Sequence, residues 1–359
     1  MSRSERTGAY RHLSPREYRP VAAAGRCWCK LGDNLRMTAR TEIANGIFEL
    51  RLPIPFEDGL VNVFLFVDGD EVDLLDCGMN SGESVELIRS TIAELGGARL
   101  RNLVVTHIHP DHYGAAGILA GPGRADLYLH RLEVPLVHPR YVELEQLVIE
   151  VRKYLLVNGV PAGEAEVLSN SQRALSDVVA PAEPAVQLDG AETIVMGRTS
   201  LRVEWTPGHS PGHICLYAEE GGLLFAGDHM LPDLSPNIGL HPQSTPDPLH
   251  EYLEGLRRMA ALKPRLILPA HGRPFEDAAG RVERLADHHR RRMDRVMAIL
   301  ADGELSGWEV ALRLWGPREQ LYEKRLALQE GLAHLQAMAV EGSVRKRVSP
   351  EFVRWRLAS

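Results

Sequence analysis

The sequence predicts an α/β protein in which two groups of short apolar strands are covered by amphipathic helices. Three observations lead to this prediction. The strand-like segments are short and rich in Val, Ile and Leu, segments of helical spacing separate some of them, and His or Asp residues follow four of them directly. The chain has 359 residues, of which 44% are hydrophobic and 25% are charged. This composition is typical of a globular protein, and the length allows one large domain and a smaller one.

The first group of predicted strands covers residues 47–52, 61–67, 72–75 and 103–105. Between the third and the fourth of them, residues 84–95 have helical spacing, with Val85, Ile88 and Ile92 on one face. We therefore expect a helix that crosses over between two strands of the first sheet.

The second group of predicted strands covers residues 193–196, 201–205, 214–217, 223–226 and 266–268. Before the last of them, Thr245-Pro246 indicates the start of a helix. Its apolar face carries Leu249, Leu253, Leu256 and Met259. The second half of the chain thus repeats the pattern of the first, with short apolar strands and an amphipathic helix before the last of them.

The stretch after the strand at 103–105 carries four candidate metal ligands, which are His107, His109, Asp111 and His112. His107 and His109 are two residues apart, so in extended backbone both imidazoles project to the same side. Pro110 breaks the strand and is suited to the first turn of a helix. The segment therefore presents two rings together and then a carboxylate and a third ring. This pattern suits a two-metal centre better than a single closed structural site.

Three further strand ends carry His or Asp beside Gly or Pro, which allow tight turns of the backbone. These residues are His209 and His213 after 201–205, Asp228 and His229 after 223–226, and His271 after 266–268. Four strand ends that converge on one rim would build a metal site on a β scaffold.

Taken together, these motifs strongly resemble the metallo-β-lactamase superfamily of dinuclear metallohydrolases, over about residues 41–280. The resemblance implies an αββα sandwich. It assigns His107, His109 and His209 to one metal, Asp111, His112 and His271 to the second, and Asp228 to a bridge between the two. It also implies that Asp76, followed here by Cys77 where the family has Thr, holds a ligand rather than a metal.

The His-rich ligand set favours two Zn²⁺ ions, with Mn²⁺ or Fe²⁺ as alternatives. The resemblance implies that a hydroxide held between the ions attacks a carbonyl or phosphoryl centre while one metal stabilises the developing oxyanion. Asp111 is the candidate to orient this nucleophile and to move its proton, so we expect it to be catalytic as well as a metal ligand.

Several neighbouring residues are weaker candidates. His213 is expected to support a ligand, and His229 either lines the pocket or points away from the metals. Tyr113 and His241 are pocket candidates only because they lie close to the ligand motifs in the sequence. Cys77 and Cys215 alternate with apolar neighbours and are predicted to be small buried residues rather than nucleophiles.

Residues 131–182, between the first and second ligand clusters, are predicted to form a helical insert with Leu147, Val151 and Leu155 on one face. We expect this insert to cover the metal rim as a substrate lid, with dimerisation or simple packing as the alternative. Acidic residues outnumber basic ones in it, so it would repel a long phosphate backbone, which weighs against a nuclease.

Residues 281–359 change in character to a smaller, helical domain. Helices are predicted at 281–300, 307–315 and 318–340, followed by a hairpin of 344–348 and 352–355. Three helices and a hairpin resemble the winged-helix tail that one subgroup of the superfamily carries. Acidic and basic residues are mixed on the third helix, which disfavours DNA binding. Packing, dimerisation or walling of the pocket is expected instead.

Residues 1–40 are rich in Arg and Pro and show little periodicity, so we predict a disordered or extended tail, or a native start at Met37. Four Cys residues make no disulfide framework. No secretory signal and no apolar run of membrane-spanning length is present, so a cytoplasmic location without membrane contact is predicted. The net charge of −7 argues against a general polyanion binder.

We therefore expect a metal-dependent hydrolase of the glyoxalase II type that acts on a small-molecule thioester or ester, lactones included. A metal-dependent endoribonuclease or phosphodiesterase is the alternative, because the winged-helix subgroup includes RNA-cleaving enzymes. A DNA-binding regulator is the alternative from another class, and a full set of seven ligands argues against it.

Overall fold

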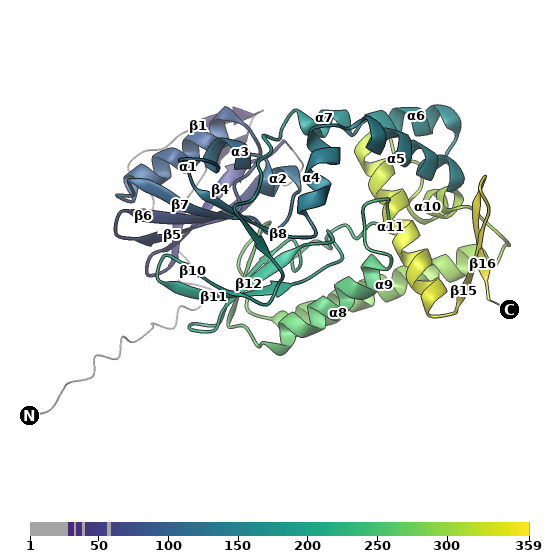
Figure 1. Cartoon of the computed structure of the whole chain (residues 1–359). Coiled ribbons are helices and arrows are strands. Elements are labelled where there is room, and N and C mark those ends of the chain that lie inside the picture. The colour runs from purple at the N-terminus through teal and green to yellow at the C-terminus, as the bar shows by residue number, and fades with distance from the viewer. Residues whose placement is uncertain (1–27, 32–33, 38–39, 56–58, 359) are drawn as a thin grey trace, which may run out of the picture.

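The computed structural model describes residues 28–31, 34–37, 40–55 and 59–358. Two β-sheets pack face to face, and helices cover the outer face of each sheet (Figure 1). The predicted αββα layering is therefore present. The two large sheets lie toward one end of the molecule, and a largely helical unit that includes the C-terminal hairpin lies at the other (Figure 1).

The first sheet has seven strands that follow one another in space as they do in the sequence. They are β3 (Arg40–Ala44), β4 (Ile47–Pro53), β5 (Leu60–Asp68), β6 (Glu71–Leu75), β7 (Arg99–Val104), β8 (Asp126–His130) and β9 (Val186–Leu188). The pairs from β3 to β6 are antiparallel, and those from β6 to β9 are parallel. Helix α1 (Gly82–Glu94) makes the crossover between β6 and β7, as the spacing of its apolar residues predicts.

Strand β5 shows why its sequence is almost continuously apolar. Val63 and Leu65 point into the core that the first sheet shares with its outer helices, whereas Phe64 and Phe66 point into the core between the two sheets. Because side chains alternate along a strand, a strand that is covered on both faces needs apolar residues at every position. Asn62 is the polar exception in this run, and it has a role at the site described below.

The second sheet has five strands. They are β10 (Thr193–Met196), β11 (Thr199–Trp205), β12 (Ile214–Ala218), β13 (Leu223–Gly227) and β14 (Leu266–Pro269). Helix α8 (Pro248–Ala261) connects β13 to the parallel strand β14, and α9 (Ala278–Leu300) lies beside it. Leu224, Tyr252 and Leu285 are buried in the core that these helices form with the sheet.

Helix α8 begins later than the Thr245-Pro246 pair predicts. Its N-cap is Asp247, whose side chain accepts a hydrogen bond from the backbone N–H of His250 at 3.4 Å. Pro248 then occupies the first helical position. Both Thr245-Pro246 and Asp247-Pro248 combine a side chain that can cap a helix with a proline suited to its first position. The helix starts at the second pair, which lies next to the apolar face.

The predicted insert consists of α4 (Val134–Tyr141), α5 (Glu145–Val157), α6 (Ala162–Asn170) and α7 (Arg173–Ser176). The C-terminal part contains α9, α10 (Gly307–Trp315), α11 (Leu321–Val340) and the hairpin β15 (Val344–Val348) and β16 (Val353–Leu357). Helix α11 begins at Leu321 rather than at 318. The other helices and the hairpin lie close to their predicted positions.

Helices α5 and α6 of the insert share one hydrophobic core with the C-terminal part. Leu147, Val151 and Leu155 of α5 belong to the same buried cluster as Leu332 of α11 and Trp355 of β16. The apolar face of α5 is therefore covered by the chain's own C-terminal helices, which accounts for its amphipathic pattern by packing (Figure 1).

Most of the predicted tail, 1–40, lies outside the described residues. Within it, β1 (Trp28–Leu31) and β2 (Asn34–Met37) form an antiparallel pair. Cys77 and Cys215 are buried free thiols, as predicted. In the part of the chain that the structure describes, no helix is both long and apolar enough to cross a bilayer.

A pair of substitutions in α5 tests whether the insert and the C-terminal helices form one core. Leu155 is 2% exposed and Ile149 on the same helix is 61% exposed. We expect Leu155→Ala to lower the free energy of unfolding by about 2–5 kcal/mol, because a buried Leu leaves a cavity, and Ile149→Ala to change it by less than about 0.5 kcal/mol. Equal effects of the two substitutions in urea titrations would contradict this packing.

Candidate metal centre

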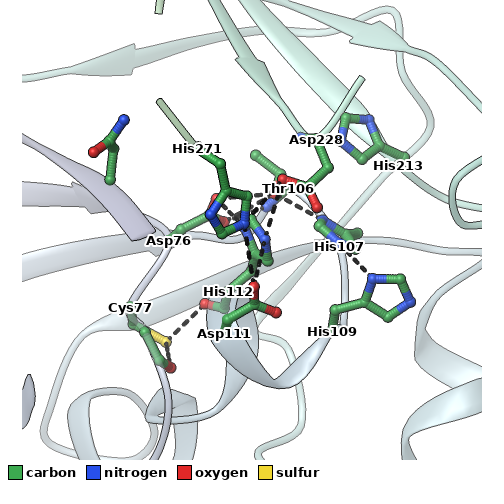
Figure 2. A network of polar contacts seen from close by, with 12 residues as sticks. Asp76, Cys77, Thr106, His107, His109, Asp111, His112, His213, Asp228 and His271 are labelled. Atoms are coloured by element: carbon green, nitrogen blue, oxygen red, sulfur yellow. Dashed lines mark hydrogen bonds and ion pairs between the residues drawn. The ribbon is translucent and has the colours of Figure 1, made fainter. Parts of the chain in front are cut away.

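The candidate ligands lie at the ends of strands that come from both sheets (Figure 2). His107 follows β7, His209 follows β11, Asp228 follows β13 directly, and His271 follows β14. Pro110 opens the short helix α2 (Pro110–Tyr113), which carries Asp111 and His112. All seven predicted ligands therefore meet at the edge where the two sheets face each other.

The first group of ligands is His107, His109 and His209, and their donor atoms lie within 4.8 Å of one another. Nδ1 of His109 lies 2.9 Å from Nε2 of His107 and 2.8 Å from Nε2 of His209. Three imidazole nitrogens so close together are a typical Zn²⁺ ligand set.

The second group is Asp111, His112 and His271, whose donor atoms also lie within 4.8 Å of one another. Oδ2 of Asp111 lies 3.2 Å from Nε2 of His271 and 3.6 Å from Nε2 of His112. This mixture of imidazole and carboxylate suits a divalent cation as well.

Asp228 lies between the two groups. Its Oδ2 is 3.3 Å from Nε2 of His209, and its Oδ1 is 3.4 Å from Nε2 of His112 and 3.5 Å from Nε2 of His271. One carboxylate oxygen thus faces each group, which is the placement that a bridging ligand requires.

Hydrogen bonds orient the ligand rings. Nδ1 of His209 donates to the carbonyl oxygen of Asn237 at 2.9 Å, and Nδ1 of His271 donates to that of Leu60 at 3.0 Å. Nδ1 of His112 donates to Oδ2 of Asp76 at 2.9 Å. Since each Nδ1 carries its proton toward the protein, each Nε2 keeps its lone pair for a metal.

Asp76 also holds the segment that leads into the ligands. Its carboxylate accepts hydrogen bonds from the backbone N–H of Thr106 at 2.8 Å and from the Thr106 hydroxyl at 2.9 Å, and the same hydroxyl lies 3.1 Å from Nδ1 of His107. Asp76 has φ +59°, a conformation that costs free energy for a residue with a side chain and that is found at functional sites.

Two buried donor atoms show that the residues fit a metal. Nε2 of His112 and Oδ1 of Asp228 are buried, and neither makes a hydrogen bond within the described part of the chain. An unsatisfied buried polar atom costs free energy, so such atoms need a partner. A divalent cation between them would supply it.

The charges of the site also favour a cation on the side of the carboxylates. Burial opposes protonation of His271, but Asp228 and Asp111 outweigh burial and raise its pKa to about 9. Burial likewise opposes ionisation of Asp111, but His112 and His271 outweigh it and lower the pKa of Asp111 to about 2. Burial lowers the pKa of His107 well below its usual value, which leaves this ring neutral and ready to coordinate.

Two supporting residues escaped the sequence analysis. Glu133 is fully buried before α4, and its carboxylate accepts hydrogen bonds from the backbone N–H groups of Ile108 at 3.1 Å and Gly212 at 2.6 Å. Asn62 in β5 donates to the carbonyl oxygens of Pro269 at 2.9 Å and Gly272 at 3.0 Å, on either side of His271. The position of Asn62 inside the apolar run 61–67 could have indicated its supporting role. No sequence pattern indicates that Glu133 binds the backbone of Ile108 and Gly212.

The weaker candidates have other roles. Nε2 of His213 accepts a hydrogen bond from the backbone N–H of Asp228 at 3.1 Å and so supports a ligand. The ring of His229 packs 5.1 Å from that of Tyr252 in the core under α8. The hydroxyl of Tyr113 donates to the carbonyl oxygen of Ala182 at 2.7 Å and fastens the end of the insert. His241 is half-buried, and its Nδ1 accepts from the backbone N–H of Gln243.

Sandwich and ligand geometry together define a metallohydrolase, and the comparisons with known proteins agree. The model of the metallo-beta-lactamase superfamily matches residues 57–271. The chain therefore belongs to the metallo-beta-lactamase superfamily of metal-dependent hydrolases.

Three relatives illustrate this membership. The chain is 32% identical to a metallo-beta-lactamase family protein of Thermus thermophilus, covering 88% of this chain and 100% of the other with a TM-score of 0.76. It is 26% identical to a beta-lactamase domain protein of Burkholderia ambifaria, covering 89% and 94% with a TM-score of 0.76. It is 28% identical to "Probable metallo-hydrolase YqjP" of Bacillus subtilis (strain 168), over 83% of this chain and 93% of the relative.

Replacement of His109 tests the ligand assignment. We expect His109→Ala to lose bound metal and hydrolytic activity together, because its Nδ1 lies between two other ligand nitrogens. Metal content by mass spectrometry and turnover are measured on the same sample, with the exposed His250→Ala as the control. Full metal content with normal turnover in His109→Ala would overturn the assignment.

Replacement of Glu133 tests how the two ligand loops are held. Glu133→Ala leaves two buried N–H groups without an acceptor, so we expect the free energy of unfolding to fall by about 2–6 kcal/mol. The exposed Glu143→Ala in the same insert is the control and should change it by less than about 0.5 kcal/mol. A Glu133→Ala protein as stable as the wild type in urea would show that these hydrogen bonds do not hold the loops.

Proposed function

We propose that this chain hydrolyses a small-molecule thioester or ester, lactones included, at a centre that holds two divalent metal ions. The proposal combines a superfamily of hydrolases with a ligand set of two groups and a carboxylate between them. A thioester is the preferred substrate class, as in glyoxalase II.

The observation that carries the proposal is a cavity of about 320 Å³ beside His271. Leu60, Leu231, Pro232 and Leu234 form the apolar part of its wall, and the charged residues Arg51, Asp233 and Arg273 line it as well. A volume of this order suits a small ligand, and the apolar part of the wall suits a short acyl chain. A substrate with its acyl chain in this cavity would have its carbonyl group at the metal ligands.

The residues that would hold the two ions are His107, His109 and His209 for one, Asp111, His112 and His271 for the other, and Asp228 for both. Bound divalent ions supply Lewis acidity and lower the pKa of a coordinated water molecule. Asp111 would add a carboxylate that accepts a proton at the reacting centre and passes it to the leaving group. Asp76, Asn237 and the carbonyl oxygen of Leu60 keep the rings in place throughout.

The C-terminal helices support a small-molecule substrate over a nucleic acid. Ten residues of α11 are buried, among them Leu328, Leu332 and Leu335. A helix that reads bases needs a free face with a clear positive charge. The burial of α11 instead suits a helix that walls the metal centre.

Release of thiol from a panel of acyl-glutathione and acyl-coenzyme A thioesters tests the proposal. We expect metal-dependent turnover by protein loaded with Zn²⁺ or Mn²⁺, because the ligand set needs a metal to activate water. Ester and lactone substrates in the same buffer complete the panel. Hydrolysis of none of these compounds by fully metal-loaded protein, together with cleavage of single-stranded RNA, would contradict the proposal and favour a ribonuclease.

A further inference from the structure

Arg325, in the second turn of α11, is a buried guanidinium with unsatisfied nitrogens. The residue is 7% exposed, and neither its Nε nor its Nη1 has a hydrogen-bond partner within the described residues. Its guanidinium lies 5.8 Å from the centre of the Tyr322 ring. A buried cation is costly when no carboxylate accompanies it, so proteins rarely keep one without a function.

A short chain of hydrogen bonds ties this part of α11 to the metal centre. The side chain of Asn237 donates to the carbonyl oxygen of Leu326 at 3.4 Å, and the carbonyl oxygen of Asn237 accepts from Nδ1 of His209 at 2.9 Å. Leu326, the residue that follows Arg325, is therefore connected to the metal ligand His209 through Asn237.

A second arginine approaches the same ligands from the insert. Arg140 precedes Tyr141 in α4, and the Tyr141 hydroxyl donates at 2.6 Å to the carbonyl oxygen of Ile108, which lies between two ligand histidines. Arg140 is half-buried, and its Nε donates to the side chain of Gln243 at 3.0 Å. A side-chain hydrogen bond also joins Arg140 to Tyr141, so two partners fix its guanidinium beside the ligand segment.

The electrostatics agree that both arginines lie near each other and near the first ligand group. Burial lowers the pKa of Arg325, and Arg140 lowers it further, against the influence of Tyr322. Burial lowers the pKa of His241 to about 3, and both arginines add to that shift. Burial and His209 lower the pKa of His109, and Arg140 does so as well.

We propose that Arg325 and Arg140 bind an oxyanion group of the substrate, a carboxylate or a phosphate, on the side of the metal centre formed by His109 and His209. Such a group would supply the hydrogen-bond acceptors that Nε and Nη1 of Arg325 lack, and a planar guanidinium matches it in geometry. This deepens the proposed function, on which it rests, because it names the charge that the hydrolysed compound carries.

Two matched pairs of thioesters test the proposal and locate the anionic group. Succinyl and butyryl thioesters of N-acetylcysteamine differ in a carboxylate on the acyl side. Butyryl thioesters of 4'-phosphopantetheine and pantetheine differ in a phosphate on the leaving-group side. We expect kcat/KM of the wild type to favour the anionic member of at least one pair by about 10–100-fold, the worth of hydrogen bonds to a charged group.

Arg325→Met should remove most of this preference through a higher KM for the anionic substrate, and Arg325→Lys should keep part of it. Arg313→Met on α10, an exposed arginine that pairs with Asp302, is the matched control and should leave the preference unchanged. Equal losses for charged and neutral substrates in Arg325→Met, or no preference in the wild type for either pair, would overturn the proposal.

Thermal unfolding of the metal-loaded protein gives a readout that needs no turnover. Because Arg325 carries an uncompensated buried charge, Arg325→Met should unfold at a higher temperature than the wild type when no anion is added. Succinate or inorganic phosphate should stabilise the wild type more than this variant. A lower unfolding temperature for Arg325→Met, with equal stabilisation of both proteins by the anions, would show a structural residue and overturn the proposal.

The two proposals fail separately. If the wild type hydrolyses no thioester, ester or lactone, the proposed function is wrong, and the difference in stabilisation by succinate and phosphate still decides whether Arg325 binds an oxyanion.

Discussion

The metal centre depends on the buried carboxylate of Asp76, which joins the end of β6 to the ligand segment after β7. It fixes Thr106 through both the backbone N–H and the hydroxyl, and it orients the ring of His112. His107 and His112 belong to different ligand groups, so one carboxylate sets the relative position of both. Its left-handed backbone conformation, φ +59°, is the local cost of bringing that carboxylate into place.

The helical elements also hold the metal ligands that follow the strands. Tyr141 in α4 bonds to the backbone between His107 and His109, and Asn237 joins α11 to His209. Helices α5 and α6 of the insert share a hydrophobic core with the C-terminal helices, whereas Tyr141 is buried in the core of the first sheet. The substrate side of the first ligand group is therefore shaped by residues far from it in sequence.

The sequence predicts those parts of the molecule in which local pattern and tertiary structure agree. Strand β5 is apolar throughout because both its faces are buried, and the ligands are recognisable because they cluster after strands beside Gly and Pro. The pattern of α5 predicted an amphipathic helix but not its partner, because periodicity shows that a face is buried and not against what. The start of α8 was misplaced because two successive residue–proline pairs carry the same signal.

The supporting residues could not be predicted, since their roles arise only from three-dimensional contacts. Glu133 accepts hydrogen bonds from two backbone groups more than a hundred residues apart. Arg325 resembles any charged residue on a helix of mixed charge until its burial and its unsatisfied nitrogens are known. Sequence patterns therefore point to the chemistry of the centre, whereas substrate recognition has to be derived from the folded chain.

Anomalous diffraction from crystals grown with Zn²⁺, recorded above and below the zinc absorption edge, tests the central claim most directly. The account predicts two peaks, one among His107, His109 and His209 and one among Asp111, His112 and His271, with Asp228 touching both. A single peak, or zinc bound only outside these residues at saturating Zn²⁺, would contradict a dinuclear centre.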